Sequence, residues 1–207
     1  MKKNFLNWSM VAAAGLFVSM FSASTTTVLA QCGECPIVGQ PIDCPGSSKS
    51  DLEAQGYTLT VETLTDGRFI VTSCTAPPPG CPTPWETTLE IDRFEGHGHD
   101  PVLGDLHWRN DPTRSITPSS YFQGYQKDQQ FPAFGVIQFY AECEVDGIPG
   151  VFRSLEPVRL INREVHSFNP FRGELFVKDP DTKPVVFYNE EADQKFVLMH
   201  LESLLGQ

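Results

Sequence analysis

The stretch YTLTVETLTDGRFIVT, residues 57–72, decides the fold class. Its apolar residues Tyr57, Leu59 and Val61 alternate with polar residues, which is typical of a strand with one buried face. The dipeptide Asp66-Gly67 follows, and Asp-Gly accepts the positive φ angle that a tight hairpin turn needs. The stretch therefore predicts two antiparallel strands joined at Asp66-Gly67.

Similar strand patterns continue along the chain. A second Asp-Gly pair, Asp146-Gly147, predicts a second hairpin. Pro, Gly, Asn or Asp separates nearly all of the runs, which cover 87–94, 136–143, 148–155, 158–162, 174–178 and 185–188. About eight short strands at this spacing predict an all-β fold, an antiparallel β-sandwich, with a small β-barrel as the alternative.

Three segments interrupt this pattern. Residues 31–56 are rich in Cys, Pro and Gly and predict an irregular N-terminal arm before a β-rich domain over 57–207. A long loop is expected at about 95–134, and loops of that length often carry binding or catalytic residues. The apolar spacing of Val197, Leu198, Leu201, Leu204 and Leu205 predicts a C-terminal helix capped by Asp193, or else a last strand from Phe196 to Leu201.

Residues 1–30 have the three parts of a secretory signal peptide. Lys2 and Lys3 precede an apolar run from Met10 to Phe21, and small or branched residues lead to Ala30. The apolar run is shorter than the roughly 20 residues of a membrane span, which disfavours an uncleaved anchor. We expect cleavage after Ala30 and a secreted, single-domain chain, with lipidation of Cys32 as an alternative that Gln31 disfavours.

All six cysteines follow the expected cleavage site, and an even number in an exported chain favours disulfides. The proline loop between Cys74 and Cys81 makes these two a plausible local pair. The pairing of the others is open among Cys32, Cys35, Cys44 and Cys143. The spacing of Cys32 and Cys35 resembles that of a redox dithiol. Such a dithiol has its first cysteine at the N-terminus of a helix that follows a strand, and no strand precedes Cys32.

Charge limits the partners. The formal net charge is −11, and loss of Lys2 and Lys3 would make it −13. Such a surface repels phosphate backbones and anionic headgroups, which argues against nucleic acids and membrane surfaces. It tolerates cationic partners or calcium, for which the oxygen-bearing cluster Asn189, Glu190, Glu191 and Asp193 is the candidate.

Histidines make the strongest chemical candidate. Three of the five histidines fall within eleven residues, next to two carboxylates: His97, His99, Asp100, Asp105 and His107. If both pieces are extended, imidazoles and carboxylates project to one side, which suits zinc, copper or iron. The alternative is a set of solvated loop histidines.

Aromatic residues in the same region offer a second candidate. Trp108, Tyr121 and Tyr125 could stack on sugars or anchor a protein partner, or they could fill a small core under the loop.

No recognisable catalytic set accompanies these residues. The chain has no Gly-x-Ser-x-Gly elbow and no His-Glu-x-x-His helix motif. The sequence therefore favours a non-catalytic binding or structural module of the cell envelope or extracellular space, with a protein or glycan partner. A metal-dependent enzyme using the histidines, or a carbohydrate-binding module, remain the alternatives.

Overall fold

A computed structural model describes residues 36–75, 85–114, 120–126, 129–167 and 171–206. Over these ranges the chain has twelve strands and no helix, and all strand pairings are antiparallel within one sheet. The all-β, antiparallel class predicted from the sequence is confirmed. Within the described ranges there is accordingly no helix able to cross a lipid bilayer.

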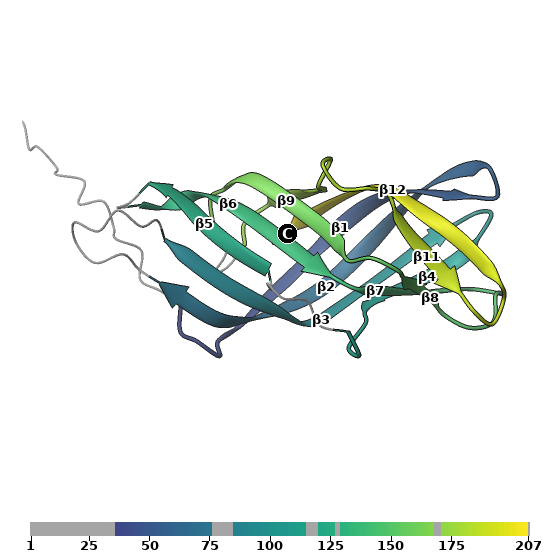
Figure 1. The fold of residues 1–207 in the computed structure, drawn as a ribbon, viewed down its shortest axis with the longest axis horizontal. Coiled ribbons are helices and arrows are strands. Elements are labelled where there is room, and N and C mark those ends of the chain that lie inside the picture. Colours follow the sequence, from purple (N-terminus) through teal and green to yellow (C-terminus); the bar gives the residue numbers. More distant parts are fainter. Residues whose placement is uncertain (1–35, 76–84, 115–119, 127–128, 168–170, 207) are drawn as a thin grey trace, which may run out of the picture.

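The first three strands of the chain have 14 to 19 residues, while the others have 3 to 12 (Figure 1). The strands are β1 (Pro41–Ala54), β2 (Tyr57–Thr75), β3 (Glu86–Asp100), β4 (Gly104–Asn110), β5 (Ser120–Gln126), β6 (Gln129–Phe139), β7 (Ala141–Val145), β8 (Phe152–Ser154), β9 (Val158–Val165), β10 (Glu174–Lys178), β11 (Val185–Asn189) and β12 (Gln194–Leu205).

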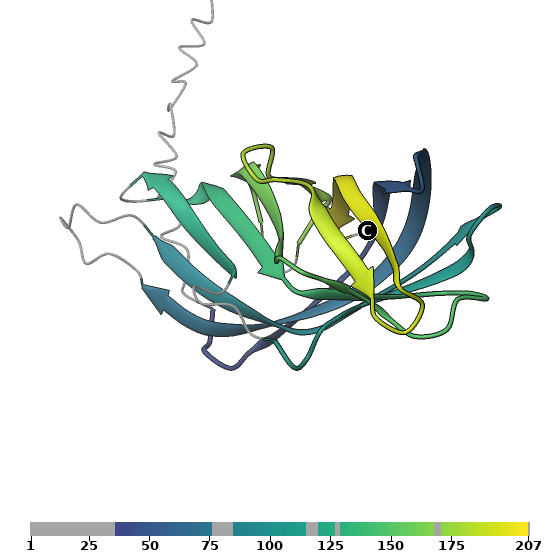
Figure 2. The same ribbon diagram turned by 45° about the vertical axis from the view of Figure 1, so that its right-hand side comes forward.

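The sheet closes on itself because different parts of one strand pair with different neighbouring strands. Its order is β1-β2-β3-β4-β7-β8-β11-β12-β10-β9-β6-β5, with further pairings of β1 with β12 and of β3 with β5. The first part of β3 pairs with β5 and its last part with β4, while β12 pairs first with β11 and then with β10. Strands β5, β6 and β9 to β12, green to yellow in Figure 2, therefore arch over β2 and β3.

The hairpin predicted at Asp66-Gly67 is wrong, because β2 runs straight through both residues. Gly67 lies opposite Cys44 on β1 and Phe94 on β3, and alternate residues from Val61 to Val71 are buried. The turn that joins β1 and β2 lies instead at Gln55-Gly56, where both φ angles are positive. The second predicted hairpin is confirmed, since β7 and β8 pair across a turn in which Gly147 has a positive φ.

The irregular arm expected before Tyr57 contains strand β1. Its prolines, Pro41 and Pro45, pair with β2 on one side, and pairing with β12 begins only at Gly46. A proline cannot donate a ladder hydrogen bond and is tolerated where one side of a strand is an edge. Composition therefore hid a strand whose prolines lie along its unpaired section.

The long loop expected at about 95–134 is also wrong, because strands β3 to β6 occupy most of this segment. Gly96 and Gly98 suggested a loop, but they lie in β3 where the backbone is crowded. An added Cβ would come within 2.8 Å of Thr63 Cγ2 at Gly96 and within 2.7 Å of the Glu62 carbonyl oxygen at Gly98. Glycine in a strand often marks such a close approach.

The C-terminal helix is wrong, and the alternative of a last strand is confirmed. Strand β12 has a register shift against β1, since Asp51 pairs with His200 but Leu52 pairs with Leu198. An extra residue in a strand moves the following side chains to the opposite face. Buried residues change there from Phe196 and Leu198 to Ser203 and Leu205, and this change produced the helix-like spacing.

Aromatic side chains fill the interior. Phe187 stacks on Phe196 with ring centroids 4.8 Å apart, and Trp108 meets both rings edge-on. At the other end, Phe171 lies near Phe69, Phe122 and Phe176. Two interior cavities measure only about 30 Å³ each, which is close to the space of one water molecule.

Three of the six cysteines lie in the described ranges. Cys44 and Cys143 are buried free thiols, so the expectation that all six form disulfides is wrong for these two. Cys74 is disulfide-bonded, and its partner lies outside the described residues, as do Cys32, Cys35 and Cys81.

Candidate functional site

A groove of about 1360 Å³ lies on the face of the sheet opposite the core. One row of directly paired residues forms its floor, running from β10 across β12, β1, β2, β3 and β4 to β7. The members of this floor row, in that order, are Leu175, Leu204, Ser47, Leu64, His97, His107 and Glu144. The turn between β7 and β8 adds to the lining.

Strand alternation explains how the floor row comes together. Side chains of a strand point alternately to the two faces of a sheet, and Leu64 stands exposed between the buried Thr63 and Thr65. Register then places His97 beside Leu64, and His107 beside His97. Residues up to 157 positions apart along the chain thus share one surface, from Ser47 to Leu204.

The groove is acidic, with apolar side chains among the charges. Five carboxylates and one lysine line it: Glu62, Asp105, Glu144, Asp146, Glu202 and Lys49. Two of the three leucines of the floor row are unusually exposed, with Leu64 75% and Leu175 48% accessible, while Leu204 is partly buried. Such a surface attracts cations and can also bury apolar groups of a ligand.

The histidine candidates from the sequence divide into separate contacts. His97 and His107 are cross-strand partners whose rings stack with centroids 4.4 Å apart and planes 8° apart. The next pair, His99 and Asp105, forms an exposed ion-pair contact of 2.7 Å between Nδ1 and Oδ1. The five residues therefore do not form one cluster.

Asp100, predicted as a metal ligand, has a structural role. Its carboxylate is buried and accepts hydrogen bonds from the backbone N–H groups of Val102 and Leu103 at 2.8 and 2.9 Å. Asp100 thus stabilises the turn between β3 and β4. The structure adds Glu95 instead, whose carboxylate comes within 4.8 Å of ligand atoms of His97 and His107.

The aromatic candidates do not form a binding platform. Trp108 is only 8% exposed and packs in the core, which contradicts its predicted role in stacking on sugars. Tyr121 lies beside Phe134, and the exposed Tyr125 donates its hydroxyl hydrogen bond to the carbonyl of Arg163. The alternative prediction was a small core under a loop, whereas Trp108 belongs to the main core and lies in strand β4.

The oxygen-bearing cluster predicted for calcium serves the turn between β11 and β12. Asn189 is fully buried, and its Oδ1 accepts hydrogen bonds from the N–H groups of Glu191 and Ala192. Asp193 accepts a hydrogen bond from the hydroxyl of Tyr188. Asn189 and Asp193, two of the four side chains in this cluster, therefore already have hydrogen-bond partners within the fold.

Neither free thiol is suited to nucleophilic chemistry. Burial raises the pKa of Cys44 and of Cys143 far above the usual range, and the carboxylates of Asp43 and Asp66 add to the effect at Cys44. The thiolate is the reactive form of cysteine, so both groups remain inert thiols.

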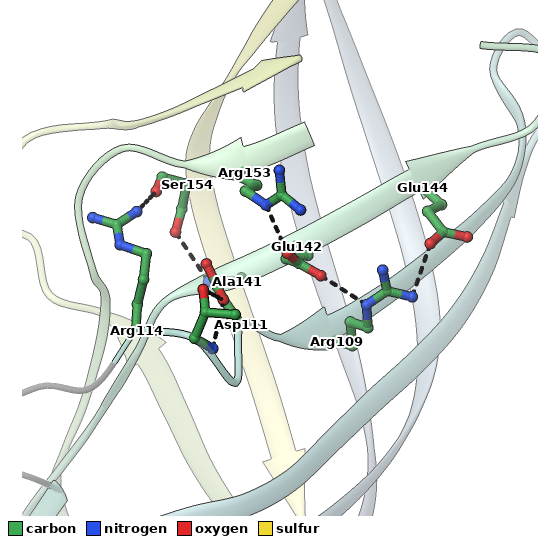
Figure 3. A network of polar contacts seen from close by, with 9 residues as sticks. Arg109, Asp111, Arg114, Ala141, Glu142, Glu144, Arg153 and Ser154 are labelled. Atoms are coloured by element: carbon green, nitrogen blue, oxygen red, sulfur yellow. Dashed lines mark hydrogen bonds and ion pairs between the residues drawn. The ribbon is translucent and has the colours of Figure 1, made fainter. Parts of the chain in front are cut away.

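A polar network flanks the groove on the same face of the sheet (Figure 3). Glu142 lies between two arginines, 2.8 Å from Nε of Arg109 and 2.7 Å from Nε of Arg153. Arg109 also contacts Glu144 of the floor row at 2.8 Å. The hydrogen bond to Glu142 is the main reason that the pKa of Arg109 is raised. The network fixes the edge of the groove at β4 and β7.

A second hollow, the end cleft, is smaller and apolar. It measures about 400 Å³ and lies where the turns after β1, β3, β7 and β11 approach one another. Its lining includes Leu52, Tyr57, Val102, Ile148 and Phe196. Sequence analysis missed it, because residues from four separate hairpins contribute to it.

Comparison with known proteins finds a similar fold but no relative at the level of sequence. No family model and no curated protein matches the chain. The fold itself, an antiparallel sheet closed through shared long strands, has a solved counterpart. The structure of DynF from the dynemicin biosynthesis pathway of Micromonospora chersina is similar at a TM-score of 0.66, covering 83% of this chain and 82% of DynF at 15% identity.

Proposed function

We propose that the protein is an exported, non-catalytic binding module that holds an extended, basic and partly apolar peptide segment in the groove. The floor row supports this most directly, because it combines a hollow of about 1360 Å³ with carboxylates and exposed leucines. The interior cavities of about 30 Å³ offer no comparable space for a ligand.

The size of the groove suits a peptide. Neighbouring strands lie about 4.8 Å apart, so a row across seven strands extends about 29 Å. An extended chain advances about 3.4 Å per residue, which gives room for roughly eight residues. An extended peptide turns every second side chain toward the floor, so a peptide that carries both basic and apolar residues at these positions would place its cations near Glu62, Glu144 and Glu202 and its apolar groups on the leucines.

Titration calorimetry with two synthetic octapeptides tests this function. We expect the Lys/Leu peptide Lys-Lys-Leu-Leu-Lys-Lys-Leu-Leu, which presents both residue types on each side when extended, to bind. The matching peptide with Glu in place of Lys should not bind, because the groove carries five carboxylates and one lysine. Leu64→Ser should weaken binding of the Lys/Leu peptide about tenfold, since burying a leucine stabilises by about 1.5–3 kcal/mol.

Leu155→Ser is the matched control, because Leu155 is 54% exposed but does not line the groove. This variant should bind the Lys/Leu peptide as the unchanged protein does. Equal affinity for the two peptides, or equal losses in the two leucine variants, would exclude the groove as a basic-peptide site.

Export is tested separately, by mass spectrometry of the protein produced from its full sequence in a secreting bacterial host. The proposal expects a mature chain that begins at Gln31, since the signal-peptide pattern ends at Ala30. A mature chain that still begins at Met1, or one that begins at a lipidated Cys32, would contradict it.

A further inference from the structure

We propose that Glu95, His97 and His107 together bind one divalent transition-metal ion at the β3–β4 side of the groove. Each of the three residues offers a ligand atom, and these atoms lie within 4.8 Å of one another. The inference does not rest on the peptide-binding proposal, because these three side chains could bind an ion with no peptide in the groove.

Strand geometry brings the three ligand side chains together, and the stacked rings of His97 and His107 must turn for both to direct a nitrogen lone pair at one ion. Glu95 and His97 are two residues apart on β3, so their side chains point to the same face. His107 is the direct cross-strand partner of His97, and the two rings are stacked. Sites on regular strands are more precisely positioned than sites on loops.

The ligand atoms are available for an ion. Nε2 of His107 is buried and has no hydrogen-bond partner among the described residues, a state that costs free energy. In the tautomer that leaves this nitrogen unprotonated, a bound ion would satisfy its lone pair. His97 forms no ion pair within the part of the chain that the structure describes.

The carboxylate of Glu95 is also uncommitted, although two arginines lie close by in the sheet. Arg109 is its cross-strand partner but contacts Glu142 and Glu144. Arg93, two residues away on β3, contacts Asp66 at 2.6 Å. Over the described ranges no ion pair involves Glu95, whereas His99 is held by Asp105.

The donor set determines the class of ion. Two imidazole nitrogens and one carboxylate oxygen suit zinc, copper, nickel or iron, whereas calcium and magnesium prefer oxygen ligands alone. Affinity for such a site generally rises along the first-row series to copper and falls at zinc. We therefore expect Cu²⁺ to bind more tightly than Zn²⁺, with water in the remaining coordination positions.

Calorimetry on the tag-free, chelator-treated protein tests the site, with Cys32 and Cys35 replaced by serine to remove competing thiols. One Zn²⁺ per chain should bind, and His97→Ala and Glu95→Gln should each weaken binding about tenfold or more. His99→Ala is the matched control, because His99 lies on the same face of β3 and is paired with Asp105. It should leave the affinity unchanged.

Electron paramagnetic resonance of the Cu²⁺ form gives a second readout. The unchanged protein should show coupling to two imidazole nitrogens, and His97→Ala should show one. Absence of stoichiometric metal, or a loss in His99→Ala equal to that in His97→Ala, would overturn the proposal. Leu64→Ser should bind metal normally, so failure of the peptide proposal and failure of this one are separable.

Discussion

Phe187→Ala is expected to lower the free energy of unfolding by about 3–5 kcal/mol, the usual cost of truncating a buried phenylalanine. Phe187 has no exposed surface, stacks on Phe196 and receives the edge of the Trp108 ring. A cavity of about 30 Å³ already lies beside Phe187, and removing the ring would enlarge it, which adds to the loss of stability. Denaturant unfolding followed by tryptophan fluorescence measures the loss.

Its matched control is Tyr188→Ala on the next residue, whose side chain points to the opposite face of β11. Tyr188 contributes one exposed hydrogen bond to Asp193, so its removal should cost less than about 1 kcal/mol. Similar losses in the two variants would show that β11 does not present Phe187 to a packed core.

Gly46→Ala should be the second most damaging change, because Gly46 lies where β1 meets β12 and closes the sheet. An added Cβ would come within 2.2 Å of the carbonyl oxygen of Leu204, which is backbone and cannot turn aside. We expect a loss of about 3 kcal/mol, at the upper end of overpacking costs. For a chain of this size that lowers the melting temperature by about 6–12 °C.

Gly67→Ala on the neighbouring strand is the control for Gly46→Ala. Gly67 also lies within a strand, but an added Cβ would stay 3.4 Å from the nearest atom, the carbonyl oxygen of Cys44. Its melting temperature, measured by calorimetry, should stay within about 3 °C of the unchanged protein. If both alanine variants melt alike, β1 and β12 do not pair as described.

Local patterns predicted the strand class but only one of the two hairpin turns, and they missed β1. The buried positions of β2 keep one phase through Asp66-Gly67, from Val61 to Val71, and this continuity was the available signal for a single strand. The turn chemistry of Asp-Gly outweighed it in the prediction. The helix-like spacing of β12 arose from a bulge, which depends on pairing with β1 and is invisible in the segment itself.

The candidate site was predictable in part. Proximity in sequence pointed to His97 and His107, and the structure places the two side by side on one face, while metal binding there stays a prediction. Glu95 was missed, although the same alternation applies to it. Trp108 and Asp100 were misassigned, because a tryptophan or a carboxylate looks the same in sequence whether it faces the core, caps a turn or meets solvent. The rest of the floor row depends on register between distant strands, which local sequence does not encode.

The most direct test of the account is to map the amide chemical shifts of the labelled protein during titration with the Lys/Leu octapeptide. The account predicts shifts along the floor row, at Ser47, Leu64, His97 and Leu204, which separate strands bring together. Shifts confined to the end cleft, around Tyr57, Val102 and Lys195, or no shifts at all, would contradict it.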